Sequence, residues 1–225
     1  TAGEIFGQYR AVQQRSAQRI TNLVFMGMGE PMLNYENVMR TVEILTHEKT
    51  GGVAASHITL STAGLADKIR RMADEQRKIK LAISLHATTD ELRQRLMPIN
   101  KKFPLEALLD AAAHYYRQTR RRITYEYILF DGLNDGDDDI RRLVRLTRRV
   151  PSKVNIIPFH PIHSAYPEGL PMQLTPTPRE RIERFAAALR AAHVTVMLRS
   201  SSGHDIDAAC GQLAVRHRTK QTDNV

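Results

Sequence analysis

The residues of this chain that could do chemistry stand where apolar runs end. Glu30 follows the run Asn22–Met28 within the pentapeptide GMGEP, whose two glycines allow a tight turn and close approach of a ligand to the backbone. Its carboxylate could accept hydrogen bonds from a ligand ammonium group, and the alternative is a strand-ending turn that leaves the carboxylate in water. The pentapeptide is not a dinucleotide-binding G-x-G-x-x-G fingerprint, because Pro31 would sit poorly inside a phosphate-binding helix.

Hydroxyl groups and a histidine close the next two apolar runs. Ser61 and Thr62 end one of them, and Ser84, Leu85 and His86 end the other. The hydroxyls could hydrogen-bond a ribose or a carboxylate, and His86 could carry a proton; alternatively the hydroxyls cap the helices that follow. Ser84 and His86 would share one face of a strand, but no third partner is evident, so we do not predict a hydrolase triad.

The chain has one cysteine, Cys210, in the segment DIDAACGQL. A lone cysteine is usually a small buried apolar residue. Here a polar stretch precedes it and Gly211 follows it, and an accessible thiol in a basic protein could have a lowered pKa and act as a nucleophile. The residues alone leave both interpretations open. A single cysteine excludes an intrachain disulfide and any metal site that needs three cysteines from this chain.

Helices and strands must bring these residues together, and the hydropathy pattern predicts where those helices and strands lie. Short apolar runs at 22–28, 57–61, 80–86, 123–130, 153–159 and 194–198 alternate with helical patterns at 3–16, 34–47, 65–76, 105–117, 139–149 and 179–192. This alternation predicts an α/β fold with a parallel sheet, wound as a Rossmann-like layer or as a barrel. In both architectures ligands bind at the carboxyl ends of the strands, where the polar residues stand.

The net charge of the chain indicates which class of molecule it binds. Lys and Arg total 33 and Asp and Glu total 24, which gives a formal charge of +9 and excludes an acidic solvating protein. The basic runs, such as Arg77-Lys78 and Arg120–Arg122, favour a polyanionic partner, although some of them will be solvated helix faces. No apolar run is long enough to span a bilayer and no secretion signal opens the chain, so we expect a cytoplasmic, reducing setting.

Taken in order, several segments closely resemble the RlmN family, radical S-adenosylmethionine enzymes that methylate C2 of adenosine in RNA. The matching segments are NLVFMGMGEPMLNYENV, HITLSTAG, KLAISLHATTDELRQRLMPINKKF, ITYEYILFDGLND, VNIIPFHP and GHDIDAACGQLA. The Cfr enzymes, which modify C8 of the same rRNA base, share much of this pattern and remain a sibling interpretation. The resemblance implies a partial (β/α)₆ barrel without its first strand and cluster loop, a radical SAM core over residues 1–214 and a basic, disordered tail at 215–225.

The same resemblance implies a cofactor site. S-adenosylmethionine would be held by the residues matching the family's contacts, which are Gly29, Glu30, Ser61, Ser84, Leu85, His86 and His160, the last replacing the family's asparagine. Cys210 matches the cysteine that carries the methyl group, and a second cysteine of the family resolves the protein–RNA adduct as a disulfide. The C-x-x-x-C-x-x-C ligands of the family's [4Fe–4S] cluster, the resolving cysteine and the base have no counterpart here. We therefore expect an N-terminally truncated fragment that is inactive alone.

The partners that the resemblance implies are 23S rRNA at the peptidyl transferase centre, tRNA next to the anticodon, and an electron donor for the cluster. It also implies a monomer. Two rival functions remain: an RNA-binding remnant without catalysis, and a radical S-adenosylmethionine enzyme that acts on a small molecule. The charge of +9 and the CGQLA segment argue against the second rival.

Overall fold

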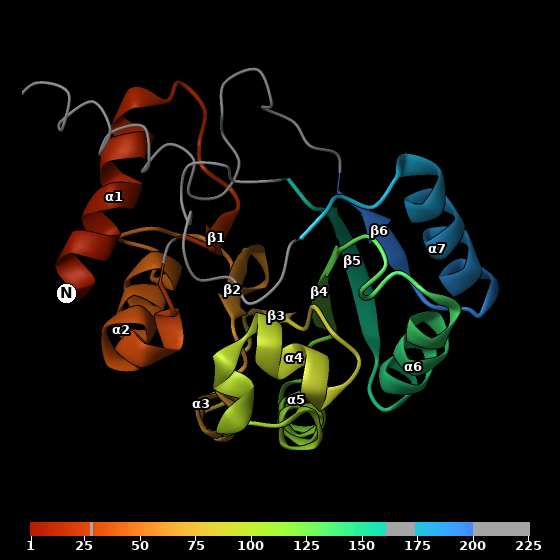
Figure 1. Ribbon diagram of the computed structural model, residues 1–225. Helices are drawn as coiled ribbons and strands as arrows, with labels where there is room; N and C mark the ends of the chain where they lie inside the picture. Colours follow the sequence, from red (N-terminus) through yellow and green to blue (C-terminus); the bar gives the residue numbers. More distant parts are fainter. Residues whose placement is uncertain (28, 161–173, 200–225) are drawn as a thin grey trace, which may run out of the picture.

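The computed structural model describes residues 1–27, 29–160 and 174–199 (Figure 1). Its strands are β1 (Leu23–Phe25), β2 (Ile58–Thr62), β3 (Lys80–Ser84), β4 (Ile123–Leu129), β5 (Ser152–Pro158) and β6 (Val196–Leu198). Its helices are α1 (Ala2–Arg15), α2 (Tyr35–Thr46), α3 (Ala66–Asp74), α4 (Asp90–Leu96), α5 (Leu105–Thr119), α6 (Asp137–Arg148) and α7 (Arg179–Ala191). Short 3₁₀ turns lie at η1 (Pro31–Asn34), η2 (Ala55–His57) and η3 (Pro98–Lys101). Cys210 and the predicted tail at 215–225 lie outside the described residues.

The six strands form one parallel sheet in the order β1-β2-β3-β4-β5-β6. A Rossmann-like layer would reverse its strand order at a switch point, whereas here each strand pairs with the next one along the chain. Within the described residues β1 and β6 each have one neighbour, so the sheet is an open, barrel-like arc. Helices α2, α3, α5, α6 and α7 lie along one side of that arc (Figure 1). The predicted α/β class and the partial-barrel winding are therefore confirmed.

The alternation of side chains along the strands separates a core face from an inner face. On β4, Tyr125 and Tyr127 are fully buried in the hydrophobic core beneath the helices. Glu126 and Ile128 alternate with them and therefore face the opposite side, away from those helices. Because apolar side chains supply the core face of every central strand, the inner face is free to carry polar groups.

Three local differences from the sequence prediction have physical causes. Helix α4 was not predicted, because its buried position carries a charged residue, Arg93, so its sequence shows no apolar stripe. Helix α6 begins two residues early, at Asp137, since three consecutive aspartates suit the positive end of a helix. Strand β3 ends at Ser84 rather than at His86, because His86 adopts a left-handed backbone with φ of 54°.

In the described part of the chain, no helix combines the length and the apolar character that crossing a membrane would require.

Candidate functional site

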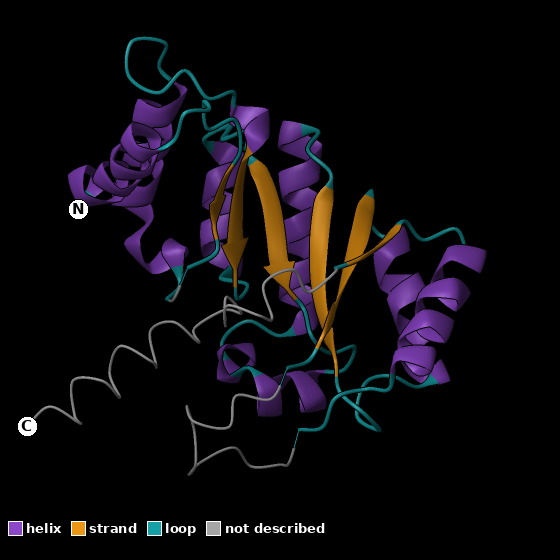
Figure 2. Cartoon of the chain, turned by 90° about the horizontal axis from the view of Figure 1, so that it is seen from above, coloured by secondary structure: helices purple, strands orange, loops and turns teal. Residues whose placement is uncertain are grey.

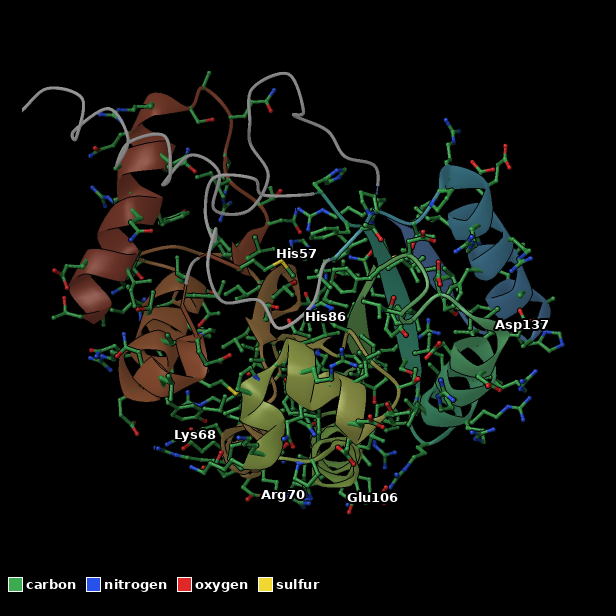
Figure 3. The ribbon with its side chains drawn as sticks, in the orientation of Figure 1. His57, Lys68, Arg70, His86, Glu106 and Asp137 are labelled. Carbon is green, nitrogen blue, oxygen red and sulfur yellow. The ribbon has the colours of Figure 1, made fainter. Side chains whose placement is uncertain are left out.

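A cavity of about 360 Å³ opens at the carboxyl ends of the strands, on the inner face of the sheet. This volume falls within the usual range of small-molecule sites. Five of the residues singled out from the sequence line it together, although they come from three different strand ends: Gly29, Glu30, Ser61, Ser84 and His86. Figure 3 places His86 in the middle of the molecule, whereas Lys68, Arg70 and Glu106 lie on the outer, helical side.

Glu30 joins two of the loops that form the cavity wall. Its Oε1 accepts a hydrogen bond from the Met32 backbone N–H at 2.9 Å, and its Oε2 accepts one from the Ala63 backbone N–H at 2.6 Å. The expectation of a carboxylate left in water is therefore wrong. Each carboxylate oxygen keeps a second lone pair, so Glu30 can still accept hydrogen bonds from a ligand.

The glycines beside Glu30 leave the backbone open to the cavity. Gly29 has a φ of +96°, a conformation that residues with a side chain rarely adopt. A Cβ atom built on either Gly27 or Gly29 would meet no heavy atom within 4 Å. The two positions therefore face empty space in which a ligand can approach the backbone closely.

His86 is held as a neutral imidazole. Its Nδ1 accepts a hydrogen bond from the Ile128 backbone N–H at 3.2 Å, which places the ring proton on Nε2. Burial, together with the positive charge of Arg93, lowers the pKa of His86 to about 4. At neutral pH His86 is consequently a hydrogen-bond donor rather than the proton carrier that the sequence allowed.

Asn134 fixes the backbone of His86. Its side-chain Nδ2 donates to the His86 carbonyl at 2.8 Å and to the Ile128 carbonyl at 2.7 Å, while its Oδ1 accepts from the Phe130 N–H at 2.7 Å. Asn134 is fully buried. This asparagine, one of the polar residues that follow β4, therefore supports the site without facing the cavity.

The serine hydroxyls do not cap the helices that follow them. Helix α3 is capped at Leu65 and helix α4 at Thr89, so capping is the wrong interpretation for Ser61 and Ser84. Thr62 makes a local turn instead, because its Oγ1 accepts from the Gly64 N–H at 3.0 Å. The hydroxyls of Ser61 and Ser84 thus belong to the cavity wall.

Three other candidate residues lie away from the cavity wall or outside the described chain. The side chain of Leu85 is fully buried in the hydrophobic core, so it does not face the cavity. His160 is half-buried in the segment after β5 and is not one of the residues that line the cavity. Cys210 lies outside the described residues.

A buried arginine that sequence reasoning missed holds the cavity loops in place. Arg93 donates from Nε to the Leu85 carbonyl (3.3 Å), from Nη1 to Asn100 Oδ1 (2.9 Å), and from Nη2 to the carbonyls of Ala63 (2.7 Å) and Ser84 (3.1 Å). Burial lowers the pKa of this guanidinium to about 10, so it remains charged at neutral pH. Arg93 therefore ties the loop after β2 to the loop after β3.

A second missed residue is Glu126, a buried carboxylate on the inner face of β4 that lines the cavity. Its Oε2 accepts from Asn155 Nδ2 at 2.7 Å. Burial raises the pKa of Glu126, and Asn155, Arg199 and Lys153 oppose that rise. The signal in the sequence was a charged residue in the middle of an apolar strand, at the position that alternates with two buried tyrosines.

The electrostatic character of the cavity follows from these residues. Two carboxylates, Glu30 and Glu126, face it together with Arg199 and two serine hydroxyls, while His86 carries no charge at neutral pH. Carboxylates and hydroxyls accept hydrogen bonds, and the glycine backbone permits close contact. The arrangement suits a small ligand that has a positively charged group and several polar hydrogens.

Comparison with known proteins gives consistent matches. Residues 9–145 match the profile of the radical SAM superfamily. The chain is 46% identical to a "probable dual-specificity RNA methyltransferase RlmN" of Salinibacter ruber, a match that covers 95% of this chain and 58% of the relative. It is 47% identical to the "dual-specificity RNA methyltransferase RlmN" of Geobacter sulfurreducens, covering 95% of this chain and 56% of that protein. The chain thus spans less than two thirds of these relatives.

Two solved structures share the fold. A radical SAM methyltransferase from Sphaerobacter thermophilus superimposes with a TM-score of 0.86 at 43% identity, covering 94% of this chain and 61% of that one. A domain of pyruvate-formate lyase-activating enzyme from Bacteroides vulgatus gives a TM-score of 0.57 at 16% identity, covering 80% of this chain and 100% of that one. The second likeness concerns the fold alone.

Proposed function

The chain belongs to the radical SAM superfamily, and on this premise we propose that it forms the S-adenosylmethionine-binding part of an RNA methyltransferase that methylates C2 of adenosine. The observation that carries the proposal is the convergence of Glu30, Ser61, Ser84 and His86 from three strand ends on one cavity. The similarity to methyltransferases named RlmN, over 95% of this chain, supports the choice of RNA as substrate.

The residues that face the cavity fit S-adenosylmethionine. That molecule carries a sulfonium, an ammonium and a carboxylate group. The cavity offers two carboxylates for the positive groups, Arg199 for the carboxylate, and a neutral histidine that does not repel positive charge. The open backbone at Gly27 and Gly29 admits close contact. When bound, S-adenosylmethionine supplies the methyl group and, in this superfamily, the adenosyl radical.

Each cavity residue has a role that follows from its geometry. Glu30 is already oriented by two backbone N–H groups, so its remaining lone pairs can hold the ammonium group of the cofactor in one direction. The hydroxyls of Ser61 and Ser84 can bond the carboxylate or the ribose. His86 donates from Nε2 and contributes no competing charge.

A [4Fe–4S] cluster belongs to the superfamily, but these residues do not fit one. Cluster binding needs several cysteine thiolates, and the 225 residues contain one cysteine. The cluster ligands are therefore not among these 225 residues. On the family resemblance we propose Cys210 as the residue that carries the methyl group to the RNA, within a core that spans residues 1–214 and precedes a basic tail at 215–225.

We also propose the finer substrate assignment, namely 23S rRNA at the peptidyl transferase centre and tRNA next to the anticodon, with an electron donor as a further partner. The formal charge of +9 suits a polyanionic substrate.

The test is to incubate the complete gene product, reduced and with its cluster reconstituted, with RNA and S-adenosylmethionine labelled in the methyl group. Digested RNA should contain labelled 2-methyladenosine, and the Cys210 peptide should carry an S-methyl group. Labelled 8-methyladenosine would favour the Cfr-like alternative. Label in RNA without any on Cys210 would overturn the assignment of that residue.

A further inference from the structure

A group of six basic side chains lies at the opposite end of the sheet from the cavity. These residues, called here the amino-edge patch, occupy the end of α5, the loops before β3 and β4, and the first position of β3: Lys78, Lys80, Arg117, Arg120, Arg121 and Arg122. All are exposed except Arg121, which is half-buried. In Figure 2 the arrowheads of the strands point down the page, so the loops that precede the strands lie along the upper edge of the sheet.

Hydrogen bonds hold the loops of this patch side by side. Arg121 donates from Nε to the Lys78 carbonyl at 3.0 Å, and Arg122 donates from Nε to the Ser152 carbonyl at 3.0 Å. The Arg121 bond therefore holds together two segments of the patch that lie 43 residues apart in the sequence.

The cations of the patch lie close together and have no carboxylate partners in the described part of the chain. Within the described residues, none of its six cations forms an ion pair, whereas some exposed arginines elsewhere do, as Arg40 does with Glu43, Arg141 with Asp138 and Arg179 with Glu183. Other arginines without an ion pair among these residues, such as Arg10, Arg70 and Arg190, lie on three separate helices. The acidic residues nearest to the patch along the chain are engaged elsewhere: Asp74 contacts His114, and Glu75 contacts Arg71 and Arg77. No ion pair within the described residues therefore neutralises the positive charges of the patch.

The backbone at Arg120 adds a separate observation. Arg120 ends helix α5 in the left-handed conformation, with a φ of 57°. Glycine is the residue usually found at such a helix end, because a Cβ atom is strained there. Gln76 and His193 adopt the same conformation just after α3 and α7, so the strain does not by itself mark Arg120 as functional; it means that glycine can replace Arg120 without loss of stability.

We propose that the amino-edge patch is a second RNA-binding surface, which contacts the phosphate backbone of the substrate at a distance from the modified base. The proposal rests on the proposed function for its choice of substrate. On β3, Lys80 of the patch lies four residues before Ser84 of the cavity wall, so the two sites lie about 13 Å apart at roughly 3.3 Å per residue. Arginine binds phosphate with its planar, forked group, and contacts to phosphate position an RNA without reading its sequence.

An acidic protein, such as an electron donor, is the alternative partner for a basic surface. A donor must come close to the redox centre, which in this superfamily belongs with the cofactor at the carboxyl ends of the strands. The patch lies at the far end of the sheet, where a long RNA can reach but an electron donor would be remote. The position of the patch therefore favours RNA.

The test compares two triple variants of the complete gene product that lose the same number of charges. The patch variant combines Lys78→Gln, Arg117→Gln and Arg120→Gly. The control combines Arg40→Gln, Arg141→Gln and Arg179→Gln, which remove exposed arginines that have carboxylate partners. Binding is measured against salt for a short stem-loop that carries the target adenosine and for the same stem-loop with an extended flanking helix.

We expect the patch variant to lose the gain in affinity that the extended helix provides, and its slope of log affinity against log salt to shrink by about two to three. Binding of the short stem-loop and of S-adenosylmethionine should match the wild type. The control variant should keep the gain for the extended RNA. The single variant Arg120→Gly should have a melting temperature at or above that of the wild type, so any loss of RNA binding that this substitution causes is not a loss of folding. Gln76→Gly should behave in the same way, because it removes the strain of the same backbone conformation (φ of 55°) without removing a charge.

Other outcomes separate the inference from the proposed function. Equal losses in both triple variants would mean that net charge alone matters, and an unchanged patch variant would mean that RNA does not touch this surface; either result overturns the inference while methylation of RNA stands. Normal RNA binding with impaired reduction of the cluster would assign the patch to an acidic electron donor and also overturn it. If the extended RNA gains affinity through the patch but is never methylated, the inference stands and the proposed function falls.

Discussion

Replacing the buried Arg93 by methionine tests whether one side chain holds the cavity loops together. Methionine has a similar length and no hydrogen-bond donors, so the change removes the donors to three backbone carbonyls and to Asn100 without leaving a large void. Arg93 is fully buried, so water does not replace the lost donors.

The expected loss of stability follows from those four contacts. Hydrogen bonds from charged donors contribute about 1.5–3 kcal/mol each, and buried acceptors left without a donor cost about 1–3 kcal/mol. The cost of burying the guanidinium offsets part of this stabilisation. Burial lowers the pKa of Arg93 from its usual value of 12.5 to about 10, and this shift corresponds to a cost of about 3 kcal/mol. The net expectation for Arg93→Met is a loss of about 3–5 kcal/mol, because the four lost contacts outweigh the recovered cost of burying the guanidinium.

Urea unfolding followed by circular dichroism measures this loss, with Arg95→Met as the matched control. Arg95 lies on the same helix, α4, but is exposed, and we expect no measurable change from its replacement. Affinity for S-adenosylmethionine should also fall in Arg93→Met, under conditions where the variant is still folded. A loss below about 1 kcal/mol, or an equal loss in both variants, would refute the role given to Arg93.

Three further changes test other parts of the structure. Tyr125→Phe should raise the free energy of unfolding by about 1 kcal/mol in urea titration, because the buried Tyr125 hydroxyl has no hydrogen-bond partner among the described residues. Tyr127→Phe should lower it by removing the 2.9 Å bond to the Asn134 carbonyl. The pKa of His86 is about 4 in the folded protein and 6.5 in the unfolded chain. The contribution of His86 to the free energy of unfolding should therefore be fully present above pH 6.5 and should fall by at most about 3 kcal/mol as the pH drops to 4. His86→Asn should make the free energy of unfolding depend less on pH over this range. Glu30→Gln should weaken S-adenosylmethionine binding about 10- to 100-fold in calorimetric titration, since the new amide nitrogen would face one of two backbone N–H groups. The surface variant Glu36→Gln should bind S-adenosylmethionine like the wild type. Unchanged binding in Glu30→Gln, or an unchanged pH profile in His86→Asn, would contradict these roles.

The strands could be predicted because their signal is local. Each is a short apolar run bounded by turn residues, and a parallel sheet buried on its helical side demands that pattern. The order of the strands in the sheet could not be predicted from such local signals, since a Rossmann-like layer and a barrel share the same alternation of strands and helices. The structure decides between them through the pairing of each strand with its successor.

The residues that line the cavity could be named because they follow strand ends, but their supporting residues could not. Arg93 looks like a surface residue of an acidic and basic helix, and its burial depends on carbonyl groups from two distant loops. The neutrality of His86 depends on burial and on a hydrogen bond from a neighbouring strand, which no spacing in the sequence shows. Glu126 was overlooked because reasoning from strand ends ignores the middle of a strand.

The proposal that this protein methylates C2 of adenosine in RNA is tested most directly by nucleoside analysis of RNA from cells that lack the gene. We predict that 2-methyladenosine disappears from rRNA and tRNA, and that the wild-type gene restores it whereas the Cys210→Ala gene does not. Unchanged 2-methyladenosine in the deletion strain, or full restoration by the Cys210→Ala gene, would contradict the account.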